Sequence, residues 1–262
     1  MNKNRKMKRK FAASVAVGMS VMMGVTPVLA ADGTADNAVS KEETVYVNAK
    51  ATGKTSKITV SNWLKNSGSV SGDLTDESNL KNIKNVKGDE TYTADGDKLT
   101  WSTDGEDIYY QGTSKEKLPV SVKLTYYLDG EKVKPSELKG KSGHLKITVD
   151  YKNNEKKTVD VDGKQTEVYT PFVMMTGMIL PNETFSNVTI DNGKIISDGN
   201  KNIVLGFGMP GLKDSLNLSD DVTDKVTIPE SLNIEADVTD FTMSSTYTVA
   251  MSDLLDDVDM DS

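Results

Sequence analysis

The chain has 262 residues, with 31 Lys and Arg against 39 Asp and Glu, a single His and no Cys. This acidic balance argues against nucleic acid as a partner, because binding to phosphates needs a basic footprint. The absence of Cys excludes disulfides and a zinc site of the usual His/Cys type.

Residues 1–30 have the pattern of a secretory signal peptide. A basic start between Lys3 and Lys10 precedes an uncharged run from Phe11 to about Val25, and small residues then lead to a predicted cut after Ala30. The run is too short for a comfortable membrane span, which is the alternative hypothesis. Cleavage would leave 25 Lys against 39 acids, a net charge of −14, and would place the protein outside the cell or on its surface.

The next segments predict a short lead-in and a hairpin. Residues 31–42 are small and polar and are expected to be disordered. Thr44–Val47 and Ile58–Val60 flank a turn at Gly53, which predicts two paired strands. Residues 67–78 are rich in Gly, Ser and Asp and indicate a loop. An apolar residue at every third position then fits either one helical turn or an irregular edge: Leu80, Ile83 and Val86.

Two segments carry the clearest structural signal. Apolar residues alternate with polar ones over Val120–Leu128 and again over Leu145–Tyr151. Successive side chains of a strand point to opposite faces, so each segment has one apolar face that needs a second layer. Asx-Gly pairs, which favour tight turns, separate further short strands. The sequence therefore predicts an all-β fold of antiparallel, sandwich-like sheets, forming one large or two small modules.

Shorter signals complete this prediction. Pro135 is expected to begin a helical turn, one of a few in the fold. Ile203–Phe207 is continuously apolar and predicts a buried strand. A polar shift at Lys152–Lys157 suggests a module boundary between residues 43–152 and residues 153–251, although the second part is equally expected to continue the same sandwich. Residues 252–262 form an acidic tail in which Ser252 is suited to begin a helix.

Candidate chemistry is sparse. His144 is the only histidine and no G-x-S-x-G motif is present, which disfavours a nucleophile–base pair. Asp104, Glu106 and Asp107 are candidate ligands for a weak calcium site, although an Asp in a turn is commonly there to form the turn. No other cofactor is indicated.

The aromatic residues suggest a possible ligand surface. Trp101, Tyr110 and Tyr127 lie on predicted strands and would form a stacking platform for sugar rings if they faced outward. The alternative is that they belong to the core. A Lys–Asn cross-link could also stabilise a core without disulfides, but Lys123 and Lys146 fall on the polar faces of their strands.

Several phrases resemble the extracellular amino-terminal region of uncharacterised Firmicutes surface proteins. They are GDKLTW, DIYYQGT, LPVSVKLTYYLDG, SGHLKITVDYKN, YTPFVMMTGMILP and MPGLKDSL, and the resemblance covers about residues 43–257. Such proteins continue into Leu-x-x-Gly heptads, and some are similar to the phage-infection-protein (Pip/YhgE) family, whose members also carry membrane spans. The resemblance implies an envelope-surface ectodomain and transfers no catalytic residue. It also implies that contact with a membrane would come only from a downstream segment.

These observations favour an exported, non-enzymatic module that acts in binding or spacing at a Gram-positive envelope. Its expected partners are a cell-wall glycan or a surface protein. Two alternatives remain: a carbohydrate-binding module that uses exposed aromatics, and a hydrolase that uses two carboxylates in a cleft.

Overall fold

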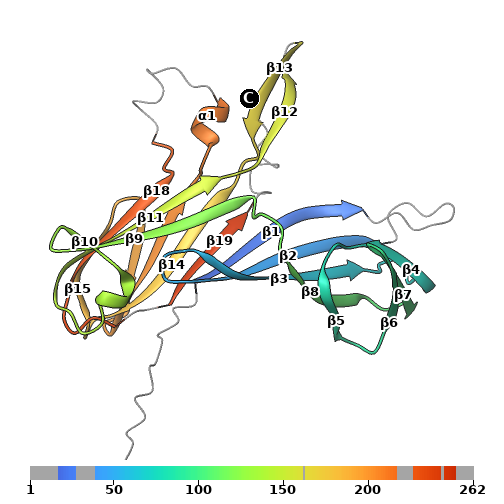
Figure 1. Cartoon of the computed structure of the whole chain (residues 1–262), viewed down its shortest axis with the longest axis horizontal. Coiled ribbons are helices and arrows are strands. Elements are labelled where there is room, and N and C mark those ends of the chain that lie inside the picture. The colour runs from blue at the N-terminus through green and yellow to red at the C-terminus, as the bar shows by residue number, and fades with distance from the viewer. Residues whose placement is uncertain (1–16, 28–38, 162, 217–226, 243–244, 252–262) are drawn as a thin grey trace, which may run out of the picture.

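The computed structural model describes residues 17–27, 39–161, 163–216, 227–242 and 245–251 (Figure 1). Most of these residues belong to strands, which confirms the predicted all-β, sandwich-like fold. The helices in this described part are the short α1 (Leu212–Leu216) and the single 3₁₀ turn η1 (Pro135–Glu137), which begins at Pro135 as predicted. None of the described helices has the length and apolarity needed to cross a membrane.

A nine-stranded sheet, here called the main sheet, runs through the whole molecule. Its pairs are antiparallel except for β1 and β19, which run parallel. Its strands lie in the order β16 (Gly193–Ser197), β17 (Lys201–Gly208), β14 (Val173–Pro181), β19 (Thr246–Met251), β1 (Val17–Pro27), β2 (Ser40–Ala49), β3 (Thr55–Lys65), β8 (Ile108–Ser114) and β5 (Lys81–Lys87).

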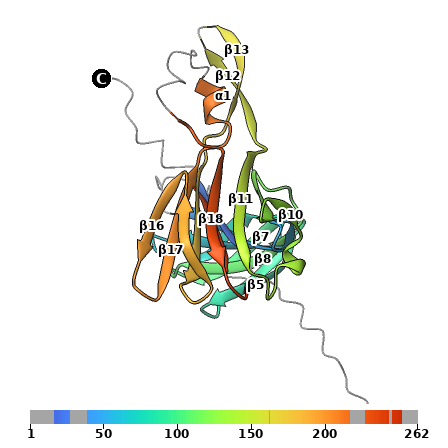
Figure 2. The same ribbon diagram turned by 90° about the vertical axis from the view of Figure 1, so that its left-hand side faces the viewer.

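Two smaller sheets cover the main sheet at its two ends (Figure 1). The second sheet has the order β10 (Glu131–Val133), β9 (Val120–Leu128), β11 (Gly143–Asn153), β18 (Ser231–Val238) and β15 (Phe185–Ile190). The third sheet has the order β4 (Ser71–Glu77), β7 (Lys98–Asp104) and β6 (Thr91–Asp95). A separate hairpin of β12 (Lys156–Val161) and β13 (Lys164–Tyr169) projects beyond the sandwich, as Figure 2 shows.

The second sheet follows the alternation of its sequence. Val149 on β11 lies opposite Leu124 on β9 and Leu232 on β18, and all three side chains are buried. Ile147 is paired in the same way with Tyr126 and Ile234. Because these rows point to one face, they form a continuous apolar layer against the main sheet.

Two glycines on β17 allow the layers to approach closely. A Cβ built at Gly206 would lie 2.2 Å from Leu232 Cδ2, and one at Gly208 would lie 2.5 Å from the Tyr151 ring. Any larger residue at these positions would clash with the facing sheet. The close approach brings the Tyr151 hydroxyl within 2.7 Å of Thr176 on β14, which satisfies both groups inside the core.

The third sheet packs on β3 and β8 at the other end. Trp101 on β7 contacts Tyr110 on β8, with ring centroids 5.3 Å apart, and both side chains are fully buried. The predicted hairpin of β2 and β3 is present. The predicted loop at residues 67–78 is wrong, because residues 71–77 form β4, which buries Leu74 and pairs with β7. β5 is an irregular edge with shifted register, as one of the two expectations had it.

Strands from both sides of the predicted boundary belong to the second sheet. β11 continues through Lys152 to Asn153 and pairs with β18, which lies in residues 153–251. The second sheet begins in the chain with β9, whereas β8, which ends at Ser114, belongs to the main sheet. The lead-in is also shorter than predicted, since Val39 is buried and β2 begins at Ser40. Residues 31–38 and the acidic tail at 252–262 lie outside the described part.

β1 (Val17–Pro27) contains the described end of the apolar run of the predicted signal peptide. β1 pairs with β19 from Val17 to Met22, and with β2 over most of its length. It therefore lies between the two halves of the main sheet (Figure 1). Residues 1–16 and 28–30 of the same predicted segment lie outside the described part.

Leu145→Ala should destabilise the protein by about 2–5 kcal/mol, because it removes a fully buried side chain between the two layers. Lys152→Ala, on the exposed side of the same strand, should change stability by less than about 0.5 kcal/mol. Urea unfolding followed by circular dichroism measures both. Equal effects of the two substitutions would contradict this assignment of the inner face.

Candidate functional site

The outer side of the main sheet carries an unusual number of exposed apolar side chains. Tyr247 on β19 is 56% exposed, Ile179 on β14 is 47% exposed and Phe207 on β17 is 40% exposed. The surface that they form with their half-buried neighbours is here called the outer apolar face. It comprises Met175, Ile179, Ile203, Leu205, Phe207, Tyr247 and Val249.

Strand register brings these residues together. Met175 lies opposite Phe207 on one side and Val249 on the other, so three apolar side chains from three strands form one row. Ile179 and Ile203 form a parallel row further along β14. Contiguous exposed apolar surface of this kind commonly marks an interaction site.

Gly177 lies in the row between these two. It is paired with Leu205 and with Tyr247, and its backbone is flanked by their side chains. A Cβ built at Gly177 would have only Leu205 Cδ2 at 3.5 Å and the Val204 carbonyl oxygen at 3.9 Å as neighbours. These are ordinary van der Waals distances, so Gly177 leaves room for a Cβ between the two neighbouring side chains.

The sequence prediction for this face is wrong in part. Ile203–Phe207 is a strand as predicted, but the structure buries Val204 and leaves Phe207 exposed. Apolar residues on both faces are typical of strands covered on both sides. In an antiparallel sheet with one covered face, the same pattern leaves one set of apolar side chains on the surface. The apolar run of β14 has the same pattern, with apolar residues on both faces of the strand.

The predicted sugar platform is wrong for two of its three residues. Trp101 and Tyr110 have no exposed surface, because both lie in the core between β7 and β8. Tyr127 is half-buried on β9, where its strand neighbours are Lys132 and Lys146. The three residues therefore do not share a surface.

A different aromatic pair lies at the surface of the main sheet. Trp63 and Tyr109 are paired across β3 and β8 and stack with ring centroids 5.4 Å apart at an interplanar angle of 17°. The Lys65 amine lies 4.2 Å from the centre of the Trp63 ring, and the Lys87 amine lies 4.3 Å from the centre of the Tyr109 ring. Because cations already cover the rings, this pair is not an open platform for a sugar.

The candidate calcium ligands lie at the turn between β7 and β8. Asp107 accepts hydrogen bonds from the Asn66 backbone N–H at 2.7 Å and from Trp63 Nε1 at 2.9 Å. Desolvation raises the pKa of Asp107, but these hydrogen bonds, together with one from Tyr109, bring the pKa below its ordinary value. The Asp107 carboxylate is thus already engaged in hydrogen bonds. The described residues contain no group of three or more His, Cys, Asp or Glu side chains arranged to hold a metal ion.

Two hollows lie beside this turn. One, of about 550 Å³, has five acidic residues among those that line it: Asp73, Asp89, Glu90, Asp104 and Glu106. The other, of about 390 Å³, shares Glu90 and Glu106 with the first and also reaches Asp107 and Tyr109. This acidic surface is the feature that a hydrolase with two carboxylates would use.

His144 lies on the exposed side of β11, opposite β18. Its Nδ1 is 3.0 Å from Asp237 Oδ1, and its Nε2 is 3.6 Å from Glu235 Oε2. The hydrogen bond to Asp237 is the main reason why the pKa of His144 is raised. Asp237 also accepts a hydrogen bond from Asn187, which is the main reason why the pKa of Asp237 is lowered. This arrangement accounts for His144 as a surface ion-pair residue.

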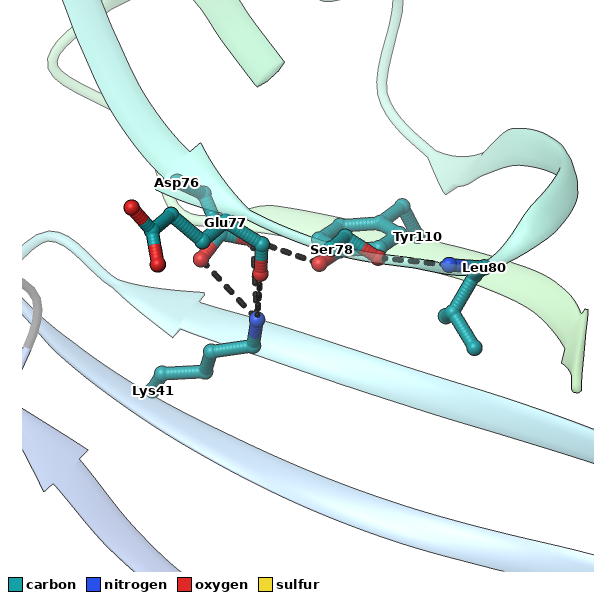
Figure 3. A network of polar contacts seen from close by, with 6 residues as sticks. All are labelled: Lys41, Asp76, Glu77, Ser78, Leu80 and Tyr110. Carbon is teal, nitrogen blue, oxygen red and sulfur yellow. Dashed lines mark hydrogen bonds and ion pairs between the residues drawn. The ribbon is translucent and has the colours of Figure 1, made fainter. Parts of the chain in front are cut away.

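A buried ion pair joins the main sheet to the third sheet. Figure 3 shows Lys41 reaching from β2 to Asp76 near the end of β4. Its Nζ lies 2.9 Å from Asp76 Oδ1 and 3.0 Å from Oδ2, and it donates to the Glu77 carbonyl oxygen at 2.9 Å. The Tyr110 hydroxyl donates a short hydrogen bond to Asp76 Oδ2. The Asp76 side chain is only 2% exposed, and its polar sequence neighbours do not indicate that this carboxylate lies in the core.

Replacing Asp237 by Asn should lower the pKa of His144 towards its ordinary value, because the principal acceptor of the imidazolium loses its charge. Since the folded-state pKa is raised, the stabilisation from this histidine is complete at low pH and is lost as pH rises through that pKa. An NMR titration of the single imidazole measures the shift. Asp150→Asn, on the same strand but away from His144, is the control, and an equal shift in both variants would contradict the assignment.

Comparison with known proteins does not assign the chain to a family. No family model matches it, and no curated protein matches it. Among solved structures, it is similar to the Fcho1 Mu homology domain of Danio rerio with bound Eps15 peptide. The TM-score is 0.37 and the sequence identity is 7%, over 90% of this chain and 97% of that one.

Proposed function

We propose that this protein is an exported, non-enzymatic module of a Gram-positive cell surface, and that it binds a protein partner through the outer apolar face. The single observation that carries the binding part is the set of paired apolar rows on β14, β17 and β19, which the described part of the chain leaves uncovered. Covering such a surface removes apolar area from water, which drives association.

The composition of this face suits a protein partner. Tyr247 and Phe207 supply large aromatic area, which is enriched at the energetic centres of protein interfaces. Met175 adds a flexible side chain that adapts to different contacts. The acidic net charge disfavours the alternative that the face inserts into an anionic membrane.

Export is supported by the order of basic, apolar and small residues in the first 30 positions. It implies that β1 is removed with the signal peptide, since Val17–Pro27 lies before the predicted cut after Ala30. Localisation at the envelope is supported by the resemblance to Firmicutes surface proteins. Glycan binding is a less suited mode, because two of the three aromatic residues predicted for it are buried and the half-buried pair Trp63 and Tyr109 is covered by lysines.

A hydrolase is the second candidate function, and the hollow with five acidic lining residues favours it. Two of these groups would act as acid and base, or as acid and nucleophile, on a bound glycan. Incubation with purified cell walls would then release reducing sugars, and Glu106→Gln would abolish the release. No release by the wild-type protein removes this candidate.

Tyr247→Lys should weaken binding to Gram-positive envelopes at least about tenfold, because it places a charge in the apolar interface. Retention of the tagged protein on isolated envelopes, and separately on protease-treated envelopes and purified glycan, measures the effect and the nature of the partner. Ser121→Lys adds the same charge to the exposed side of the second sheet and should leave binding unchanged. Retention that is equal for both variants, or that survives protease treatment, would contradict a protein partner at this face.

The mature amino terminus of the protein expressed in a Gram-positive host should be Ala31, and the protein should be recovered from the medium or the cell surface. Amino-terminal sequencing of the recovered chain checks the cut, and Ala30→Pro should block it. A chain that keeps Val17–Pro27 and remains in the cell would contradict export.

A further inference from the structure

Lys41 and Asp76 form an ion pair, and their geometry also suits a reaction between the two side chains. Both carboxylate oxygens of Asp76 lie about equally far from Lys41 Nζ, at 2.9 and 3.0 Å, so the amine faces the Cγ atom to which both oxygens are bonded. Reacting atoms in productive complexes lie roughly 3–3.5 Å apart. We propose that Lys41 and Asp76 form an intramolecular isopeptide bond that joins β2 of the main sheet to β4 of the third sheet.

The reaction balances without any added reagent. The neutral Lys41 amine attacks Asp76 Cγ, a C–N bond forms, one C–O bond breaks, and the oxygen leaves as water with two protons. The two protons come from the amine and from the carboxylic acid form of Asp76. No group is oxidised or reduced, and the product is a neutral amide.

Glu43 is the group that would carry protons between the reactants. It lies two residues after Lys41 on β2, so both side chains point to the same face of the main sheet. Burial is the main reason why the pKa of Glu43 is raised. The nearby charge of Lys41 lowers this pKa, and the charge of Asp76 raises it. A carboxyl that lies beside both reactants can give a proton to the leaving oxygen and accept one from the attacking amine.

Tyr110 would stabilise the charge that develops on Asp76 during the attack. Its hydroxyl already donates to Oδ2, the atom that would carry negative charge in the tetrahedral intermediate. Burial raises the pKa of Tyr110, so the phenol keeps the proton that it donates. The neighbouring ring of Trp101 and the buried Leu99 keep water away from this part of the core.

The surroundings favour the amide over the ion pair. The Lys41 and Asp76 side chains are 12% and 2% exposed, and two charges taken out of water are costly to maintain. Condensation removes both charges. Holding the two groups in contact in a site with little water also offsets the excess of bulk water that normally drives hydrolysis.

Asn62 offers a competing acceptor that the experiment has to distinguish. It lies on β3 opposite both Glu43 and Tyr110, is 1% exposed, and neither of its side-chain amide atoms has a hydrogen-bond partner. Attack of Lys41 on Asn62 would release ammonia rather than water. Asp76 is preferred because it is the side chain that contacts the amine.

Intact-mass measurement of the purified full chain under denaturing conditions tests the proposal, which does not depend on the proposed function. The mass should be lower than that of the sequence by one water molecule, and digestion should yield a branched peptide containing Lys41 and Asp76. A mass equal to that of the sequence, in protein that is shown to be folded by circular dichroism, would overturn the proposal. Loss of one ammonia, with a branch at Asn62, would overturn the assignment to Asp76.

Variants separate the bond from a simple ion pair. Lys41→Arg keeps the charge but should show the full mass and a melting temperature lower by about 10 °C, because a cross-link across 35 positions is lost. Glu43→Gln should slow bond formation about 100-fold or more while the fold is kept. Lys65→Arg, which preserves the half-buried pair with Glu42, is the matched control and should retain the mass loss. Mass loss that persists in Lys41→Arg would also overturn the proposal.

Discussion

The inner face of the main sheet is apolar and has to be covered by a second layer along the whole width of the sheet. The rest of the structure depends on that requirement. No single second layer is wide enough, so the second sheet covers the strands around β14 and β19 while the third sheet covers β3 and β8. Each covering sheet packs through rows of apolar side chains on paired strands, such as Val149 with Leu124 and Leu232 in the second sheet. The protein has no disulfide, so this burial must provide most of its stability.

Polar groups inside the two sandwiches are handled differently. At the second-sheet end, hydroxyls satisfy one another: Tyr151 contacts Thr176, which contacts Thr248 at 2.7 Å. At the third-sheet end the buried groups include a charged pair, and Lys41 and Asp76 depend on each other. Neutral hydroxyl chains cost little to bury, whereas a buried charge is tolerated only with a partner. The third-sheet end is therefore the more demanding of the two to assemble.

The sequence predicted the fold better than it predicted the sites. Alternation over Val120–Leu128 and Leu145–Tyr151 identified the inner face of the second sheet, because period-two burial is a local pattern. It could not identify the outer apolar face, since which side of Ile203–Phe207 is covered depends on strands distant in sequence. Asp76 was missed for a related reason: it lies in a polar segment that resembles a loop until β7 pairs with it.

The place of β1 has a consequence for how the chain matures. β2 and β19 are not neighbours, and the segment Val17–Pro27 is the only described strand that hydrogen-bonds to both. If processing removes this segment, two rows of backbone amides and carbonyls are released at the middle of the sheet rather than at its rim. The halves would then have to slide together or accept a replacement strand, so the precursor and the processed protein would differ in architecture as well as in length.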